Sequence, residues 1–382
     1  MFALIAGLVT VAAGLKVGEA PSTAFDSFLQ KYGRSYRAGS AEYKLRLARF
    51  NEHMAKVESV NSYPGAIWRA GAGPFADYST DELAALRGWF GSARSTGGGS
   101  MSARQTVFIQ EGSSLPKQVD KWNKLDNLFA RDQGACGSCW AITSATVLSA
   151  HAEIYNSSQM GFSTQELVDC VPNPRKCGGK GGCQGATAEL AFDYAMKHGL
   201  VEPSADLYTA KDQNCKFPEK MITAFKDTVP GRFEDLSLAA IHGAASNDQG
   251  LKFGMQAWEK LPENKYEPLL RALYERGPVA VSVDASDWQL YEEGIFDGCN
   301  KDAVINHAVT MIGYGEDAKS KKKYWLIQNS WGELFGEEGG RIRLLRRDDD
   351  EKQCGIDHQP QDGTACEGGP KQVTVCGMCG IL

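Results

Sequence analysis

Hydrophobic residues recur with helical spacing in two separate parts of the chain. The first part runs from Glu42 to Asn61 and is rich in charge. The second follows Cys139, where apolar residues are separated by alternating steps of four and three: Ala141, Ala145, Leu148, Ala152 and Tyr155. Residues at such steps share one face of an α-helix. We therefore predict a helix over residues 42–61 and a second helix that begins at Cys139.

Three later runs have the pattern of β-strands. Residues 277–286, 307–315 and 323–332 are rich in β-branched or aromatic side chains and are bounded by glycine or charge. Short runs of this kind are typical of strands. The chain after residue 113 therefore combines a helical half with a following β half, which predicts an α+β fold. A cleft between two such halves is where a functional site normally forms.

The chain before residue 113 divides into a leader, a helical module and a linker. An apolar stretch from Phe2 to Leu15 is too short to span a bilayer, and small residues follow it up to Ala20. We predict that residues 1–20 are a cleaved signal peptide; the alternative is a buried N-terminal helix. The Gly/Ser/Arg-rich residues 88–105 are typical of a flexible linker open to proteolysis. The N-terminal module and linker then occupy residues 21–112, and the body occupies residues 113–382.

Composition and charge narrow the class of protein. The chain has 382 residues and 42% hydrophobic content, enough for a large core. A formal charge of −6 without basic blocks gives no reason to expect nucleic acid or an anionic membrane surface as a partner. No segment after the leader approaches the roughly 18 apolar residues of a membrane span. All eleven cysteines follow the linker, and in an exported protein an odd number leaves one free thiol.

Two of the cysteines, Cys136 and Cys139, form a Cys-x-x-Cys pair whose meaning is ambiguous. It fits a redox pair, half of a metal site, or a nucleophile beside a structural thiol. Cys139 lies at the predicted start of a helix, where the helix dipole favours thiolate over thiol. His307 at the start of one predicted strand and Asn329 at the end of another supply a base and a group that orients it.

Three motifs in this order, "DQGACGSCW", "NHAVTMIGYG" and "NSWG", resemble the papain/cathepsin L cysteine peptidases. The resemblance extends from residue 24 to about residue 359. It implies a two-lobed fold, with a helical lobe and a β-barrel-like lobe, and an endopeptidase that hydrolyses proteins or peptides without a metal or cofactor. It also implies four catalytic residues: Cys139 as nucleophile, His307 as base, Asn329 as orienting residue, and Gln133 as oxyanion donor together with the Cys139 N–H.

The same resemblance implies the substrate-binding residues. The pocket for the P2 side chain, two residues before the scissile bond, would be formed by Thr187, Ala188, Ser282, Ile305 and Gln359. The adjoining groove would involve Gly185, Ala186, Asn306 and Trp331. This mostly apolar slot predicts preference for Leu, Val or Phe at P2, with some tolerance of a basic side chain. The alternative for Gln359 is that it points into solvent.

The resemblance also implies three disulfide bridges, Cys136–Cys183, Cys170–Cys215 and Cys299–Cys354, and leaves Cys139 free. It does not assign Cys177, Cys366, Cys376 and Cys379. We expect two more bridges among these four, although the tail from about residue 360 could instead form a small metal or redox element. His307 and Asn329 follow Cys139 at more than the roughly 130 to 150 residues usual in this family. A surface insertion at residues 230–262 would account for the difference.

The N-terminal module resembles the inhibitory prodomain of the same family. Its first motif matches Glu42, Arg46, Phe50, Val57 and Asn61, with His53 where asparagine is usual, and its second matches Phe75 and Asp77. The chain is then a monomeric zymogen, secreted or delivered to a vacuole or lysosome, whose own propeptide occupies the cleft. If His53 is neutral and packed, acid would charge it and loosen the prodomain. The one N-glycosylation triplet begins at Asn156.

Two other functions remain possible from sequence. A thioredoxin-like oxidoreductase would use Cys136 and Cys139 but would leave His307 and Asn329 without a role. A catalytically inactive binding or storage homologue would explain departures from the family pattern at Phe335, Gly340 and Ala186.

Overall fold

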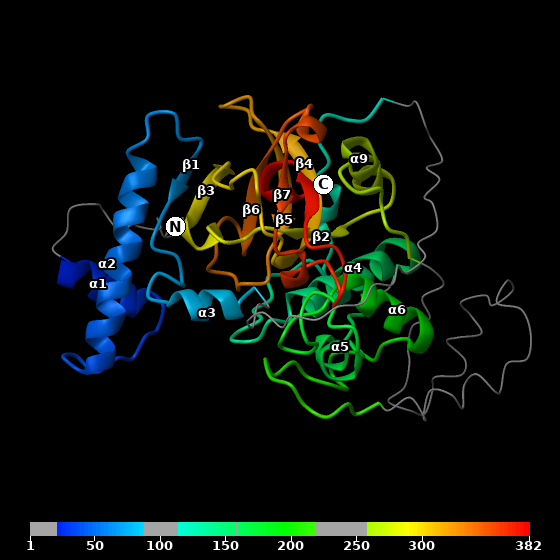
Figure 1. Cartoon of the computed structure of the whole chain (residues 1–382), viewed down its shortest axis with the longest axis horizontal. Coiled ribbons are helices and arrows are strands. Elements are labelled where there is room, and N and C mark those ends of the chain that lie inside the picture. The colour runs from blue at the N-terminus through cyan, green and yellow to red at the C-terminus, as the bar shows by residue number, and fades with distance from the viewer. Residues whose placement is uncertain (1–20, 88–113, 158, 218–257) are drawn as a thin grey trace, which may run out of the picture.

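The computed structural model describes residues 21–87, 114–157, 159–217 and 258–382. The predicted signal peptide, the linker and most of the predicted insertion at residues 230–262 lie outside this part of the chain. Within it, two hydrophobic cores form two lobes, and a helical module packs against one of them (Figure 1).

In the described part of the chain, the helical lobe contains α4 (Cys139–Asn156), α5 (Thr164–Cys170) and α6 (Ala188–His198). Helix α4 begins at Cys139, as predicted. Its predicted apolar face is only part of its buried surface, because the helix packs on α5 and α6 and also on the sheet of the other lobe. The predicted face ends early, since Tyr155 is 56% exposed.

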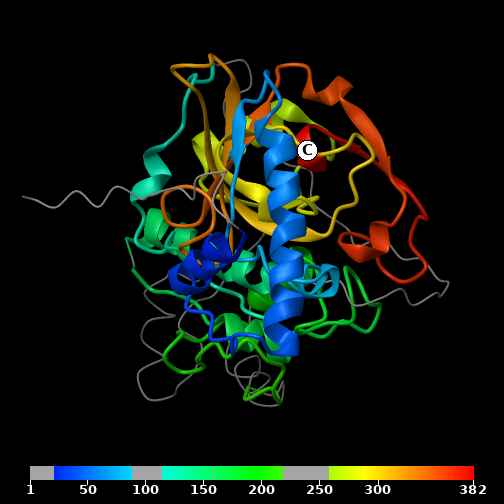
Figure 2. The same cartoon turned by 90° about the vertical axis from the view of Figure 1, so that its left-hand side faces the viewer.

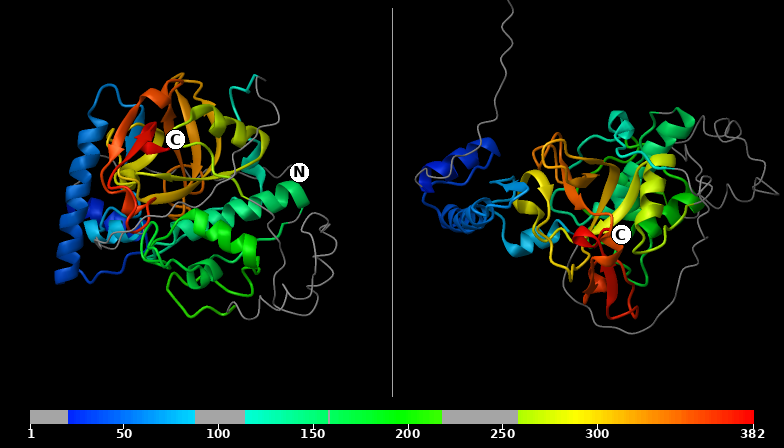
Figure 3. Two further views of the ribbon diagram at one scale, coloured as in Figure 1. Left: turned by 45° about the vertical axis from the view of Figure 1, so that its right-hand side comes forward. Right: turned by 90° about the horizontal axis from the view of Figure 1, so that it is seen from above.

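The sheet lobe contains a six-stranded sheet in the order β1-β3-β6-β5-β4-β2. Its strands are β1 (Trp68–Ala70), β2 (Val279–Val283), β3 (Tyr291–Phe296), β4 (His307–Glu316), β5 (Lys323–Gln328) and β6 (Arg341–Arg346). The three strands predicted from sequence are β2, β4 and β5. Strand β4 is buried and lies between the edge strand β2 and β5, pairing antiparallel with both, and it packs against helix α9 (Tyr266–Glu275). Figure 3 shows this sheet above the helical lobe in its left view.

The helical module at the N-terminus comprises α1 (Pro21–Lys31), α2 (Ala41–Asn61) and α3 (Thr80–Ala85). Helix α2 begins after Ser40, whose side chain accepts a hydrogen bond from the Tyr43 N–H, and it extends along one face of the molecule (Figure 2). The module has its own core, in which Phe25, Phe28 and Phe50 pack together. Strand β1 joins the module to the sheet lobe, because it pairs antiparallel with β3 at the sheet edge.

A second sheet of two strands, β7 (Cys354–Asp357) and β8 (Val373–Cys376), follows the main sheet. The remaining short elements are 3-10 turns: η1 (Lys121–Lys124), η2 (Trp288–Leu290), η3 (Asp350–Lys352), η4 (Pro360–Asp362) and η5 (Met378–Gly380).

Ten of the eleven cysteines form disulfide bridges and Cys139 is free. Two of the expected bridges, Cys136–Cys183 and Cys170–Cys215, are present. The remaining bridges are Cys177–Cys366, Cys299–Cys379 and Cys354–Cys376. All four cysteines left unassigned by the sequence are in bridges, but only Cys177–Cys366 joins two of them, because Cys376 and Cys379 pair with Cys354 and Cys299. The expectation of two bridges among these four is therefore only half right.

The expected pairing of Cys299 with Cys354 is wrong. Cys354 lies opposite Cys376 in the β7–β8 ladder, so these two are bridged, and Cys379 in the following turn reaches Cys299 instead. The chain contains the tripeptide Cys-Gly-Ile twice, at residues 354–356 and 379–381. The resemblance assigned Cys354, in the first copy, as the partner of Cys299. Cys379, in the second copy, has the same local sequence and was therefore a visible alternative partner.

Non-reducing peptide mapping should distinguish the two pairings. We expect proteolysis of the folded protein to release disulfide-linked peptides that join Cys299 to Cys379 and Cys354 to Cys376, because the β7–β8 register brings the second pair together. The mass spectrum after reduction is the control. A linked peptide that joins Cys299 to Cys354 would contradict the structure.

Candidate active site

Cys139 lies where the helical lobe meets the sheet lobe. It is the first residue of α4 and is only 4% exposed. Its neighbour Cys136 is bridged to Cys183, and the Gly137 N–H donates to the Cys183 carbonyl at 2.9 Å, which holds the turn before the helix. The Ala308 N–H of β4 donates to Cys139 Sγ at 3.5 Å. The free thiol therefore lies beside the start of β4.

His307, the first residue of β4, has one ring nitrogen fixed and one free. Its Nε2 lies 2.8 Å from Asn329 Oδ1, and the same oxygen accepts the Ser330 N–H at 2.8 Å. Because an amide oxygen only accepts, Nε2 must carry the proton. Nδ1 is buried and has no hydrogen-bond partner within the described residues. This is the tautomer that a proton acceptor at Nδ1 requires.

Two tryptophans cover this pair. The ring of Trp331 lies 5.0 Å from that of His307, centroid to centroid, and Trp288 meets His307 edge-on at 6.1 Å. Both indoles are buried. They keep water from the His307–Asn329 hydrogen bond, which is stronger in such surroundings than in solvent.

Gln133 is held as a hydrogen-bond donor towards the cleft. Ser330 Oγ donates to Gln133 Oε1 at 2.7 Å, so the amide nitrogen faces the other way. That nitrogen donates to the carbonyl oxygen of Leu86 at 2.6 Å. Leu86 follows α3 of the N-terminal module, so this module places a peptide carbonyl at the site.

Further contacts hold the N-terminal module over the cleft. Phe75 packs edge-on against Trp331, with 5.4 Å between ring centroids. Arg87 lies against the sheet lobe, where its guanidinium donates to the Ser286 carbonyl at 3.4 Å. The module thus contacts the tryptophan that covers His307 as well as the donor Gln133.

Burial beneath this module determines the protonation states of the pair. Burial raises the pKa of the Cys139 thiol to about 11 and lowers the pKa of His307 to about 4. The positive charge of Arg87 also lowers the pKa of His307. At neutral pH both groups are therefore uncharged. The sequence led us to expect a lowered thiol pKa at the helix N-terminus, but desolvation outweighs the helix dipole in this closed form.

The residues of the first prodomain motif have distinct contacts. Arg46 binds both carboxylate oxygens of Glu82 at 2.7 and 2.9 Å and also donates to the Asp77 carbonyl at 3.0 Å. Burial acts to raise the pKa of Glu82, but hydrogen bonds from Arg46 and Ser79 outweigh it and lower the pKa to about 2. Glu42 is largely exposed and lies 3.9 Å from Arg46.

The remaining motif residues are buried or bind backbone. Phe50 and Val57 belong to apolar clusters. Asn61 both donates to the Ala70 carbonyl and accepts from the Ala70 N–H at 2.9 Å, which holds β1 against α2. His53 is buried with its Nε2 3.0 Å from the Gly71 carbonyl, and burial lowers its pKa. The buried Asp77 accepts from the Tyr36 hydroxyl at 2.7 Å.

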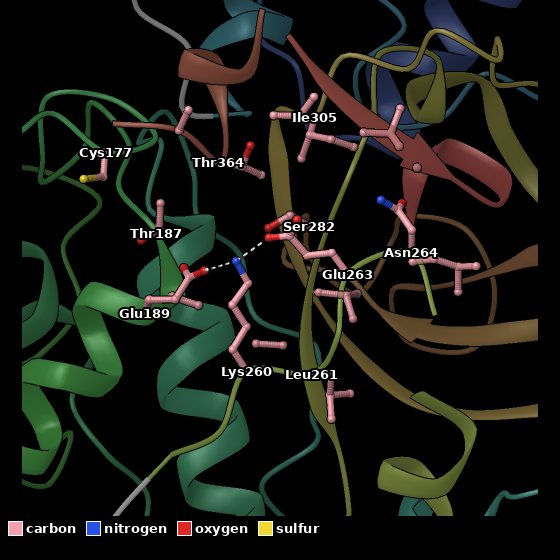
Figure 4. A pocket seen from close by; sticks show the side chains of 18 of the residues that line it. Cys177, Thr187, Glu189, Lys260, Leu261, Glu263, Asn264, Ser282, Ile305 and Thr364 are labelled. Atoms are coloured by element: carbon pink, nitrogen blue, oxygen red, sulfur yellow. Dashed lines mark hydrogen bonds and ion pairs between the residues drawn. The ribbon is translucent and has the colours of Figure 1, made fainter. Parts of the chain in front are cut away.

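A pocket of about 900 Å³ is lined by residues of both lobes. Four of the five residues expected to bind the P2 side chain line it: Thr187, Ala188, Ser282 and Ile305 (Figure 4). The first two begin α6 of the helical lobe, and the others belong to the sheet lobe. Ile305 is the lining residue nearest to His307 along the chain, two residues before it.

Of the two placements considered for Gln359, the P2 pocket or solvent, the structure shows the second. Its side chain is exposed and is not among the residues that line the pocket. Thr364 lines the pocket instead, as do Glu189 and Lys260, whose ammonium lies 4.0 Å from Glu189. Sequence reasoning missed these three. For Thr364, the sequence offered one signal: the unassigned Cys366 lies two residues further along the chain.

Two of the residues expected in the substrate groove, Asn306 and Trp331, contact other protein groups in the zymogen. The Asn306 side chain accepts from the Ala285 N–H at 3.0 Å and donates to Asp284 and Ser286, so it holds that loop. Trp331 covers His307. Gly185 and Ala186 form the buried segment that leads into α6.

The departures from the family pattern are accommodated without disturbing the pair. Phe335 is buried against Trp331, with 5.1 Å between ring centroids. At Gly340, φ is +86° and a Cβ would lie 2.6 Å from the Gly332 carbonyl oxygen, so this backbone favours glycine. Ala186 is buried. The oxidoreductase alternative fails, because Cys136 is bridged to Cys183 rather than paired with Cys139.

Comparison with known proteins agrees with this geometry. The family model for the papain family cysteine proteases matches residues 115–364. The chain belongs to the papain family. The model for the cathepsin propeptide inhibitor domain (I29) matches residues 25–83, so this family member is a zymogen that carries its own inhibitory propeptide.

Individual relatives match over most of the chain. KDEL-tailed cysteine endopeptidase CEP2 of Arabidopsis thaliana is 31% identical over 350 residues, which are 88% of this chain and 84% of that protein. Cathepsin L1 of Drosophila melanogaster is 28% identical and covers 91% of this chain and 86% of that protein. The solved structure of recombinant stem bromelain precursor superposes with a TM-score of 0.66 at 24% identity and covers 94% of this chain and 96% of that chain. This confirms the two-lobed papain-like fold with its helical propeptide.

The five disulfides and the inhibitory propeptide of this papain-family zymogen are consistent with the secretory pathway, since disulfides persist in oxidising compartments. None of the helices in the described part of the chain has the length and hydropathy that a bilayer crossing needs. No group of three or more His, Cys, Asp or Glu side chains among the described residues is placed to hold a metal ion.

Burial by the propeptide should make Cys139 slow to react with thiol reagents. Because the thiol pKa is raised to about 11, the thiolate that reacts is scarce at neutral pH. We expect alkylation of Cys139 by iodoacetamide to be on the order of 10²-fold slower in the intact zymogen than after propeptide removal. Mass spectrometry of the labelled peptide measures both rates, with Cys139→Ala as the control. Equal rates in the two forms would show that the propeptide does not shield the thiol.

Proposed function

We propose that this papain-family zymogen, once its propeptide is removed, hydrolyses peptide bonds with Cys139 as nucleophile and His307 as base. The contact that supports this proposal best is the hydrogen bond from Gln133 Nε2 to the Leu86 carbonyl, 2.6 Å long. It joins a peptide carbonyl to a fixed donor at the site that holds Cys139. Gln133 can therefore serve as one oxyanion donor and the Cys139 N–H as the other.

The reaction follows from the positions of these groups. Removal of the propeptide admits water, and a proton passes from Cys139 Sγ to the free Nδ1 of His307 to give a thiolate–imidazolium pair. Sγ attacks the substrate carbonyl carbon, and its oxygen becomes an oxyanion held by the two donors. His307 then returns the proton to the leaving amine, which departs and leaves an acyl-thioester. Water, deprotonated by His307, attacks the thioester and releases the acid and the thiol.

Asn329 would keep His307 in the required tautomer throughout. Its Oδ1 accepts the Nε2–H at 2.8 Å, and the Ser330 N–H prevents the amide from turning over. The hydrogen bond also stabilises the imidazolium, since Asn329 raises the pKa of His307 against the effect of burial. Asn329 is therefore proposed as a positioning residue.

The substrates are proposed to be proteins or peptides with Leu, Val or Phe at P2. Ala188 and Ile305 supply apolar surface in the pocket, and Thr187 and Ser282 supply hydroxyls. A basic P2 side chain could reach Glu189, which supports the tolerance that we expected. The carboxylate of Glu189 is partly engaged, because Lys260 lies 4.0 Å away.

The proposed maturation keeps the boundaries predicted from sequence. A signal peptide at residues 1–20 directs export, and cleavage between residues 87 and 113 separates the propeptide from a monomeric enzyme. The destination is an acidic vacuole or lysosome, or the extracellular space. Asn156, the last residue of α4 and partly exposed, is the proposed glycosylation site.

Gln133 can be tested by substitution. We expect Gln133→Ala to lower kcat about 10² to 10³-fold, because one of two oxyanion donors is lost. Ser330→Ala leaves the amide but removes the hydroxyl that orients it, so it should cause a smaller loss. Cleavage of a fluorogenic peptide, normalised by titration of Cys139 with an epoxide label, gives kcat. If Gln133→Ala reacts fully with the label and keeps the parental kcat, Gln133 is not an oxyanion donor. If Cys139 of the parent enzyme does not react with the label, the proposed peptidase function is wrong.

His53 links propeptide release to acid. Because burial lowers its folded-state pKa below about 6.5, the folded propeptide favours neutral imidazole, and its stability falls as the pH falls below that value. Lys56 acts in the same direction and Asp77 opposes it. The stability that the ionised Glu82 contributes is lost only at lower pH. It declines below about pH 4.5 and is gone once the pH falls below the folded-state pKa of about 2.

Replacing His53 by Asn should therefore shift the midpoint of autoprocessing to lower pH. Asparagine keeps a donor for the Gly71 carbonyl but cannot be charged. Gel analysis of proform conversion across pH measures the midpoint, with Cys139→Ala as the uncut control. An identical midpoint in His53→Asn and the parent would place the acid sensor elsewhere.

A further inference from the structure

The β7–β8 hairpin, residues 354–376, departs from the family pattern. The papain family match ends at residue 364, so the second half of the hairpin lies beyond it. Cys354 and Cys376 face each other at its base and are bridged. In Figure 3 the hairpin (orange to red) projects from the sheet lobe.

The tip of the hairpin is attached to the helical lobe. Cys366 is bridged to Cys177, which lies in the loop between α5 and α6. Beside the bridge, the Gly178 N–H donates to the Ala365 carbonyl at 3.0 Å, and the Glu367 N–H donates to the Arg175 carbonyl at 2.7 Å. An ion pair of 3.1 Å joins Lys176 to Glu367. These contacts fix the tip by both covalent and polar bonds.

The base of the hairpin is attached to the sheet lobe. The Ile305 N–H donates to Asp357 Oδ2 at 3.1 Å, and Asn264 Nδ2 donates to the Thr374 carbonyl at 3.0 Å. Cys379, just after β8, is bridged to Cys299. The hairpin therefore connects the two lobes across the cleft.

The same hairpin lines the pocket that lies between the lobes. Thr364, Ala365 and Cys366 at the tip line it, as do residues 373–375 on the returning strand. Figure 4 shows Thr364 between Thr187 of the helical lobe and Ile305 of the sheet lobe. The pocket is thus bounded by α6, by β2 with Ile305, and by the hairpin.

We propose that the β7–β8 hairpin is a specificity-determining wall of the P2 pocket, and that the Cys177–Cys366 bridge holds this wall in place. The inference rests on the proposed peptidase function, in which this pocket receives the P2 side chain. A wall fastened at both ends cannot retreat from an oversized side chain, and closely packed, rigid surroundings reject misfits. The hairpin thereby limits the size and shape of the side chain that binds.

A substitution at the tip tests the wall directly. Thr364 is exposed, so Thr364→Phe adds volume inside the pocket without crowding a core. We expect kcat/KM for substrates with P2 Phe to fall about 10-fold relative to those with P2 Val, the scale at which pocket size discriminates substrates. The matched control is His358→Phe, at an exposed position of the same hairpin that does not line the pocket. Its P2 preference should equal that of the parent.

Removal of the bridge tests whether the wall must be held. The double variant Cys177→Ala/Cys366→Ala creates no new free thiol beside Cys139. We expect its preference among P2 side chains to weaken by about 5-fold or more while its P1 preference is unchanged. The control, Cys170→Ala/Cys215→Ala, removes a bridge whose cysteines do not line the pocket. It should keep the parental P2 profile. If the first double variant does not accumulate as folded protein, Thr364→Phe alone decides.

These outcomes separate this inference from the proposed function. Titration of Cys139 with an epoxide label and cleavage of a P2 Leu substrate establish whether the parent is a peptidase. If the parent is active but Thr364→Phe leaves the ratio of P2 Phe to P2 Val unchanged, the hairpin is not a specificity wall. Equal losses at every P2 side chain would likewise overturn the inference, because they indicate general damage.

Discussion

The first turn of α4 packs against the first residues of β4, and the proposed catalytic geometry depends on this contact. It brings Cys139 of the helical lobe beside Ala308 and His307 of the sheet lobe, although they are far apart in sequence. The contact requires α4 to be buried on more than one side, which explains why its apolar pattern is broader than a single face. On the far side of His307, Asn329 at the end of β5 completes the set.

The closed form is inactive for an electrostatic reason as well as a steric one. The propeptide covers the pair and places the Leu86 carbonyl on Gln133, so the site is occupied and dry. Without water, the charged forms of Cys139 and His307 lose their solvation, and both pKa values move towards the neutral forms. The helix dipole at Cys139 can favour thiolate only after the propeptide leaves.

Two connections beyond side-chain packing hold the parts of the molecule together. Strand β1 of the propeptide continues the sheet at one edge, so the inhibitor is held by backbone hydrogen bonds. Beside the proposed P2 pocket, the β7–β8 hairpin crosses from the sheet lobe to the helical lobe and is bridged to it through Cys177 and Cys366. The first connection is removed by maturation, whereas the second belongs to the peptidase body.

The sequence by itself determined the helix that begins at Cys139, the strands at His307 and before Asn329, and the prodomain helix α2. Each rests on a spacing between neighbours along the chain, and such spacings are visible in the sequence. The motifs around Cys139, His307 and Asn329 also identified the family. Only the tertiary structure decided that Cys299 pairs with Cys379, that Gln359 lies outside the pocket between the lobes, and that Cys139 is a neutral thiol in the zymogen. Disulfide partners, pocket walls and pKa values depend on which distant surfaces meet and exclude water, and the order of residues does not specify those contacts locally.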